Sequence, residues 1–153
     1  MLLTDILKLQ NVKVPLTAVT KADAIRELVD LLALNTELTS PQKVLDSVME
    51  RESTRTTGIG YGLAIPHGKS LGVDHLTMAI GRCAQPIDFQ AIDGKPVSII
   101  WLLVSPPDKT GQHITTLAKI SKLMMGDQFR VELNQAADAK AMYDVIARRE
   151  QQI

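Results

Sequence analysis

The sequence comprises 153 residues, of which 45% are hydrophobic and 22% charged, a composition that is typical of a globular domain and excludes a disordered chain. Its 17 basic and 17 acidic residues cancel, so no basic field is available to bind nucleic acid or an anionic membrane surface. The longest strongly apolar stretch, residues 97–104, is too short to cross a bilayer, and Asp5 and Lys8 interrupt the apolar N-terminus. We therefore expect a single cytoplasmic domain over residues 1–153, without membrane insertion and without nucleic acid.

The first third of the chain predicts a strand and two helices. A short edge strand is expected over residues 12–16, with Pro15 near its end. Apolar side chains recur with helical spacing over residues 21–34, and Thr20 is available as the N-cap of this helix. Ser40 and Pro41 stand in the favoured N-cap and first helical positions of a second helix, which we expect to end between residues 51 and 53.

The rest of the chain predicts a sheet and three further helices. A glycine-rich loop, residues 57–62, precedes strands over residues 76–83, 86–89 and 97–104; the last is almost wholly apolar, as in a central strand that is covered on both faces. Helices follow over residues 112–125, with Asp108 or Thr110 as its cap, and over residues 127–134 and 138–149. This order predicts a layered α/β domain with a mixed sheet of about five strands and helices on both faces.

The sequence contains three histidines and one cysteine, and their sequence contexts predict different roles. Cys83 lies in a strand-like apolar run, which favours a small core residue over a reactive thiol. His75 follows an aspartate at the start of a strand, and we expect it to be exposed and without function. His67 stands between Pro66, which fixes the backbone, and Gly68, which permits close approach of another molecule. It is a candidate nucleophile, and a hydrogen-bonded turn histidine is the alternative.

Other residues are candidates for stabilising negative charge beside His67. His113 falls in the first turn of its predicted helix, where the helix dipole favours a neutral ring, although a capping or surface histidine is the alternative. Arg51, at the end of a helix, has the guanidinium geometry that grips phosphate, and a solvated helix-end arginine is its alternative. Weaker candidates for phosphate or backbone support are the loop residues that follow it and the glycine after His67: Arg55, Thr56, Thr57, Gly58 and Gly68.

Several better-known motifs are excluded by their spacing. Five residues separate Gly62 from Gly68 in the segment that ends Gly-Lys-Ser, where a P-loop requires four, and Pro66 interrupts it. The glycines at 58, 60 and 62 do not match the dinucleotide-binding fingerprint, and neither a zinc-ligand pair nor a serine nucleophile elbow is present. We therefore expect neither a metal nor a cofactor.

Residues 52–68 resemble the active-site signature of the fructose/mannitol-type IIA domains of the phosphoenolpyruvate-dependent phosphotransferase system. Glu52 matches the first position of that signature, Ile59 and Gly60 the middle, and residues 63–68, Leu-Ala-Ile-Pro-His-Gly, its end. The family also carries an arginine 16 positions before its phosphorylated histidine and a second histidine 46 positions after it, and Arg51 and His113 stand at these offsets. The strings at residues 57–60, 64–69, 91–93 and 96–97 make the chain most similar to the nitrogen-regulatory IIA proteins.

The resemblance implies a role for each of these residues. His67 is then the phosphorylated nucleophile, acting through Nε2, with Arg51 and His113 as its partners, and an HPr-like phosphocarrier is the donor. The chain is expected to act as a phosphotransferase component in nitrogen or metabolic regulation. Two alternatives stay open: a sugar-specific IIA component that passes phosphate to a IIB domain, and a regulatory binding module that is not phosphorylated.

Overall fold

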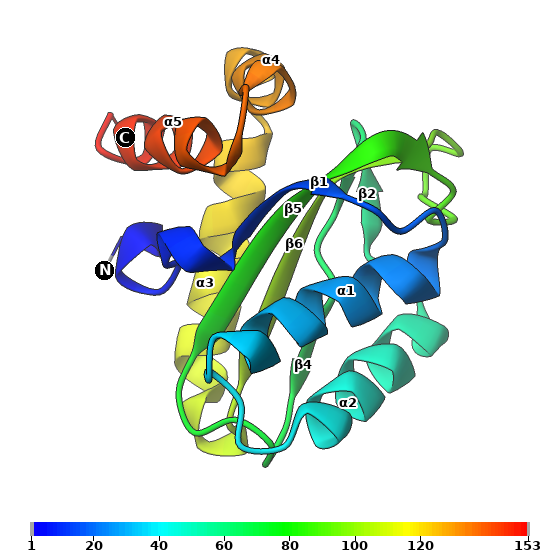
Figure 1. Cartoon of the computed structure of the whole chain (residues 1–153), viewed down its shortest axis with the longest axis vertical. Helices are drawn as coiled ribbons and strands as arrows, with labels where there is room; N and C mark the ends of the chain where they lie inside the picture. The colour runs from blue at the N-terminus through cyan, green and yellow to red at the C-terminus, as the bar shows by residue number, and fades with distance from the viewer. Residues whose placement is uncertain (1, 153) are drawn as a thin grey trace.

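The computed structural model describes residues 2–152, which form a mixed six-stranded sheet between two layers of helices (Figure 1). The strands follow the order β1-β5-β6-β3-β2, and β4 pairs with β6 on the same side as β3. Their bounds are β1 Val12–Leu16, β2 Gly58–Gly60, β3 Leu63–Ala64, β4 His67–Lys69, β5 Thr77–Ile87 and β6 Val97–Ser105. The predicted layered α/β class with a mixed sheet is confirmed, with six strands in place of about five.

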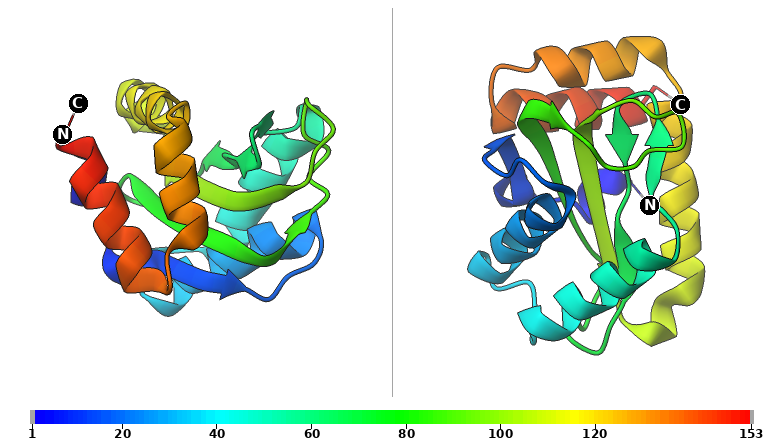
Figure 2. Two further views of the ribbon diagram at one scale, coloured as in Figure 1. Left: turned by 90° about the horizontal axis from the view of Figure 1, so that it is seen from above. Right: turned by 90° about the vertical axis from the view of Figure 1, so that its right-hand side faces the viewer.

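The helices cover both faces of this sheet, as predicted. Their bounds are α1 Lys21–Leu34, α2 Pro41–Thr54, α3 Thr110–Met124, α4 Asp127–Gln135 and α5 Ala139–Glu150, and three short 3₁₀ turns are η1 Leu3–Asp5, η2 Leu9–Asn11 and η3 Pro107–Lys109. Figure 2 shows α1 and α2 on one side of the sheet and α3, α4 and α5 on the other. No helix within residues 2–152 combines the length and the apolar character that a membrane span requires.

Helix starts follow the capping chemistry of the sequence at two of three predicted sites. The hydroxyl of Thr20 accepts the amide of Asp23, and that of Ser40 accepts the amide of Lys43, at the starts of α1 and α2. The predicted cap of α3 is wrong, since α3 begins at Thr110 with Lys109 as N-cap and without a side-chain cap bond. The turn η3 runs directly into this helix, and the Thr110 hydroxyl donates to the Pro107 carbonyl instead.

The strand predictions need two corrections. One long strand, β5, takes the place of the two strands predicted at residues 76–83 and 86–89, although it ends at Ile87, and its pairing with β6 shifts register between Arg82 and Ile87. The glycine-rich segment predicted as a loop contains β2 and β3, and β4 follows it. Hydrogen bonding to β6 decides this outcome, because β3 and β4 both run parallel to β6 and pair with successive parts of it. Side-chain periodicity does not reveal strands of two or three residues.

Each face of the sheet contributes to its own apolar core. The core beneath α1 and α2 contains Phe89, Ile100 and Val104, and the core beneath α3, α4 and α5 contains Trp101, Met78 and Phe129. Cys83 is buried in the first of these cores, and burial raises the pKa of its thiol to about 11. The prediction of a small core cysteine is confirmed. Ile100 and Leu102 point into one core and Trp101 into the other, so the central strand β6 is apolar on both faces along most of its length.

Candidate functional site

The ring of His67 is held in one tautomer by the backbone. His67 begins β4, is half-buried, and follows Pro66, whose carbonyl accepts the amide of Leu103 in β6. Its Nδ1 lies 2.8 Å from the carbonyl oxygen of Ile65. Because a carbonyl only accepts hydrogen bonds, Nδ1 carries the proton and Nε2 carries the free lone pair.

The surroundings of His67 also keep its ring neutral. Burial lowers the pKa of His67, and the positive charges of Arg51 and Lys69 lower it further. The hydrogen bond to Ile65 and the carboxylate of Glu52 act in the opposite direction without reversing the shift. A neutral imidazole with a free Nε2 is a nucleophile at physiological pH.

His113 lies beside His67 and is neutral for a similar reason. The two ring centroids are 5.5 Å apart and the rings meet edge to face at 61°. His113 is 3% exposed, and burial, with the charges of His67 and Lys69, lowers its pKa to about 4. A neutral ring is predicted from the sequence on the ground of the helix dipole, but the largest cause of the lowered pKa is burial.

Ser105 completes this pair and was missed by the sequence analysis. Its hydroxyl and His113 Nδ1 share a hydrogen bond of 2.6 Å, and the serine side chain is fully buried at the end of β6. This bond fixes the orientation of the His113 ring. A polar residue directly after an apolar strand was the available signal, because such a buried hydroxyl needs a partner.

Arg51 lies in the last turn of α2 and faces the same site. One of its guanidinium nitrogens donates to the carbonyl of Arg55 at 2.9 Å, which satisfies a free carbonyl at the helix end. Arg51 therefore occupies its helix end, as the alternative interpretation expects, and it also lines two clefts with His67. Its contact with phosphate stays a prediction.

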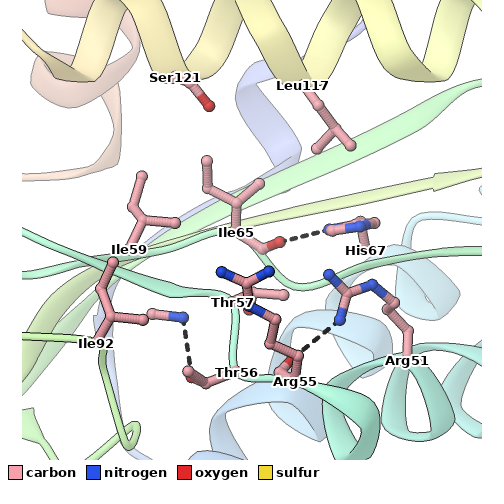
Figure 3. Close-up of a pocket in the computed structure, with 11 residues that line it drawn as sticks. Arg51, Arg55, Thr56, Thr57, Ile59, Ile65, His67, Ile92, Leu117 and Ser121 are labelled. Atoms are coloured by element: carbon pink, nitrogen blue, oxygen red, sulfur yellow. Dashed lines mark hydrogen bonds between the residues drawn. The ribbon is translucent and has the colours of Figure 1, made fainter.

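Two clefts meet at His67. The arginine cleft, about 220 Å³, is lined by Arg51, Arg55, Thr56, Ile65 and His67 among others, and Figure 3 shows the side chains of Arg51 and Arg55 pointing into it. The histidine cleft, about 420 Å³, is lined by His67, Lys69, His113, Arg51 and Gly68 among others. The three residues from the strongest predictions, Arg51, His67 and His113, are thus brought together, with cations on both sides of the nucleophile.

The loop before β2 supports the site indirectly. The amide and the hydroxyl of Thr57 both donate to the carboxylate of Glu52, with an amide distance of 2.7 Å. The amide of Gly58 donates to the hydroxyl of Thr56, which itself donates to the Phe89 carbonyl. The amides of residues 57 and 58 are therefore committed within the chain, and the expected cradle of free amides is not present at these two positions.

Gly58 and Gly68 allow close contacts within the protein. A Cβ on Gly68 would lie 3.2 Å from the amide nitrogen of Val48 and 3.3 Å from the carbonyl carbon of Ser47, both in α2. A Cβ on Gly58 would lie 2.8 Å from the Cα of Ala91. The close approach that Gly68 permits is therefore that of helix α2 of this chain, and not, as predicted from the sequence, that of another molecule.

His75 is exposed, as predicted, but two acidic side chains contact its ring. Its Nδ1 lies 2.6 Å from Asp74 Oδ1 and its Nε2 3.3 Å from Glu37 Oε2. Hydrogen bonding to Asp74 raises the pKa of His75 despite partial burial, and Glu37 adds to this effect. His75 is half-exposed but joins two loops, a role that its sequence context does not show. Among residues 2–152, no three histidine, cysteine or acidic side chains gather as metal ligands.

The chain is similar to known proteins over nearly its whole length. Residues 5–149 match the family described as phosphoenolpyruvate-dependent sugar phosphotransferase system, EIIA 2. A nitrogen regulatory protein of Bradyrhizobium diazoefficiens is 34% identical over 147 residues, covering 95% of this chain and 94% of that protein. The fructose-specific EIIA component of the phosphotransferase system of Haloferax volcanii is 34% identical over 128 residues, covering 84% of this chain and 83% of that protein.

A solved structure extends the similarity to the fold. The crystal structure of the nitrogen regulatory protein IIA-Ntr from Neisseria meningitidis has a TM-score of 0.87 and 32% sequence identity, and the match covers 94% of this chain and 98% of that one. The resemblance inferred from the signature at residues 52–68 is thereby confirmed. The chain belongs to the EIIA type 2 family of the phosphoenolpyruvate-dependent sugar phosphotransferase system.

Proposed function

We propose that this chain is a phosphohistidine carrier whose His67 accepts a phosphoryl group from the phosphohistidine of an HPr-like protein. The observation that carries the proposal is the hydrogen bond from Nδ1 to the Ile65 carbonyl, because it leaves the Nε2 lone pair free beside two clefts. Membership of a phosphotransferase family supports the reaction class.

The transfer is an in-line exchange between two imidazoles. His67 Nε2 attacks phosphorus, the nitrogen–phosphorus bond of the donor breaks, and its electron pair stays on the donor ring. The proton on Nδ1 of His67 does not move, and the Ile65 carbonyl stabilises the positive character that the ring gains. Such a step depends on positioning and on charge stabilisation rather than on acid–base chemistry. It needs neither a metal nor a cofactor.

Arginine side chains supply the charge stabilisation in this proposal. Arg51 has one guanidinium nitrogen engaged with a carbonyl and others directed to the arginine cleft. Within residues 2–152 the guanidinium of Arg55 makes neither a hydrogen bond nor an ion pair, and it points into the same cleft (Figure 3). Paired guanidinium donors bind phosphate oxygens well. Arg55 therefore joins Arg51 as a phosphate contact, and neutral His113 positions the His67 ring.

The downstream step that we favour is regulation. Similarity over nearly the full length of a nitrogen regulatory protein supports a carrier whose phosphorylation state is read by a partner. A phosphoryl group adds roughly −1.5 to −2 charge at pH 7 and changes how a surface docks. The Haloferax relative, a fructose-specific EIIA component, supports the second candidate, in which phosphate passes to a IIB domain.

Phosphorylation in a reconstituted relay tests the proposal. The protein is incubated with phosphoenolpyruvate, enzyme I and HPr, and acid-labile phosphate is measured by mass spectrometry and by ³¹P NMR. We expect one phosphoryl group per chain on Nε2 of His67, and none in His67→Ala. A native chain that gains no phosphate would leave the unphosphorylated binding module as the function. Adding purified IIB then separates the two carriers, because only a sugar-specific component passes its phosphate to IIB.

A further inference from the structure

Lys21 is anchored close to the site although it is remote from it in the sequence. It is the first residue of α1, where the helix dipole disfavours a cation. Its ammonium lies 2.8 Å from Oε2 of Glu52, donates to the Phe89 carbonyl at 3.3 Å and sits 4.9 Å from the centre of the Phe89 ring. The side chains of Lys21 and Glu52 are 18% and 3% exposed. The ion pair with Glu52 therefore explains a lysine at this helix start, because a cation there does not stabilise α1.

A chain of hydrogen bonds leads from this ion pair to the nucleophile. Glu52 accepts the amide and the hydroxyl of Thr57. The carbonyl of Thr57 accepts the amide of Ile65 at 3.1 Å, and the carbonyl of Ile65 accepts Nδ1 of His67 at 2.8 Å. Figure 3 shows the last of these bonds. The backbone that orients His67 is thus fastened to α2 through a carboxylate whose counter-ion is Lys21.

The charges around His67 also link Lys21 to the nucleophile. Arg51, Lys69, His113 and Glu52 act on the ionisation of the His67 and His113 rings, Arg55 lines the same cleft as His67, and Glu52 is the acidic group of this set. An uncompensated carboxylate at this place would attract a proton to His67, and a protonated ring has no lone pair on Nε2. The ammonium of Lys21 compensates that carboxylate. Removing one partner of a buried ion pair leaves the other charge without compensation.

We infer that Lys21 is a positioning residue for phosphoryl transfer, which it supports by neutralising Glu52 and by holding the Thr57–Ile65 backbone that presents His67 Nε2. This inference rests on the proposed function, since it assumes that His67 is the nucleophile. Lys21 lies outside the sequence signature at residues 52–68.

The test compares Lys21→Met with a matched control. Lys13→Met removes a second ammonium, one that lies 2.8 Å from Oε2 of Glu27, a carboxylate that also holds backbone amides, those of Thr17 and Ala18. That pair sits on edge strand β1 and helix α1, and it lines neither cleft at His67. Both variants and the native chain are studied by urea unfolding, by the initial rate of phosphorylation from HPr, and by ¹⁵N NMR of the His67 ring.

We expect Lys21→Met to lower the initial rate at pH 7 by about tenfold, partly because His67 Nε2 is less well aligned and partly because more of the ring is protonated. The NMR titration should show a higher pKa of His67 and a smaller fraction with the proton on Nδ1 alone, so the part of the rate loss that is due to protonation should disappear as the pH rises. Lys21→Arg should keep most of the native rate. The double variant Lys21→Met/Glu52→Gln should restore the native pKa of His67, since it removes both charges and keeps an acceptor for Thr57.

Two results would overturn the inference: a His67 titration in Lys21→Met that matches Lys13→Met, or a rate loss that the change in unfolding free energy fully explains. Should Lys21→Met not fold, Lys21→Gln is measured in its place, because glutamine retains a hydrogen bond to Glu52 without the charge. The ring titration does not require phosphate. A native chain that is never phosphorylated therefore refutes the proposed function, whereas an unchanged ring titration refutes only the role of Lys21.

Discussion

Replacing His113 with glutamine should remove a large part of the pH dependence of stability. In the folded chain the pKa of His113 is lowered from 6.5 to about 4, chiefly because its ring is buried beside Ser105. In the unfolded chain the ring takes up a proton near its ordinary pKa. The stabilisation is therefore fully present above pH 6.5, is lost as the pH falls toward 4, and levels off below that value.

The size of the effect follows from the two pKa values. Where only the unfolded chain binds the proton, the free energy of unfolding falls by about 1.4 kcal/mol for each pH unit. With pKa values of 6.5 and about 4, His113 accounts for a loss of about 2 kcal/mol between pH 7 and pH 5. His67 and His75 are present in both proteins, so their contributions cancel when the variant is compared with the native chain.

Urea unfolding measures this difference directly. Trp101 is the only tryptophan, is fully buried in β6, and reports unfolding by fluorescence. The native chain should lose about 2 kcal/mol more than His113→Gln between pH 7 and pH 5. Equal losses in the two proteins would show that His113 titrates normally in the folded state. The burial and the bond to Ser105 would then not control its protonation.

Three further predictions follow from the contacts around the site. Arg51→Ala should slow phosphorylation of His67 by about 100-fold while urea unfolding shows an intact fold, because Arg51 contributes mainly to charge stabilisation. Gly68→Ala should lower the free energy of unfolding by about 1–3 kcal/mol, since its Cβ would press on the backbone of α2, and Gly111→Ala, with open space around its Cβ, is the control. The raised pKa of His75 gives a contribution to stability that is present below pH 6.5 and lost as the pH rises through that raised value; His75→Gln should abolish this loss in unfolding measured from pH 6 to pH 9.

The helices of this fold could be predicted because their signals are local. Thr20 before an amphipathic stretch and Ser40 before Pro41 mark the starts of α1 and α2 without reference to the rest of the molecule. The residues of the site were found by a signature and by two fixed offsets, 16 positions back to Arg51 and 46 forward to His113. A fixed offset predicts which residues meet. It does not predict the distance of 5.5 Å between the two rings.

The parts that could not be predicted depend on partners far away in the sequence. Strands β3 and β4 exist because β6, some 35 residues further on, offers free backbone groups to them. The sequence context of Ser105 and Lys21 does not identify their partners, because β6 and α1 bring them to His113 and Glu52 only in the folded chain. The hydrogen bonds of the Thr57 and Gly58 amides could not be predicted either, because only the fold shows that Glu52 and Thr56 accept them.

The tautomer of His67 is set by a carbonyl, and this choice suits a residue that must gain a charged group. A carboxylate at the same place would also orient the ring, but it would raise the pKa of the free histidine and repel a phosphoryl group carrying roughly −1.5 to −2 charge. The Ile65 carbonyl fixes Nδ1 without a net charge. The acidic group near the site, Glu52, is set back behind Thr57 and is paired with Lys21. The positive field of Arg51, Arg55 and Lys69 therefore reaches the clefts at His67 without an unpaired acidic group to oppose it.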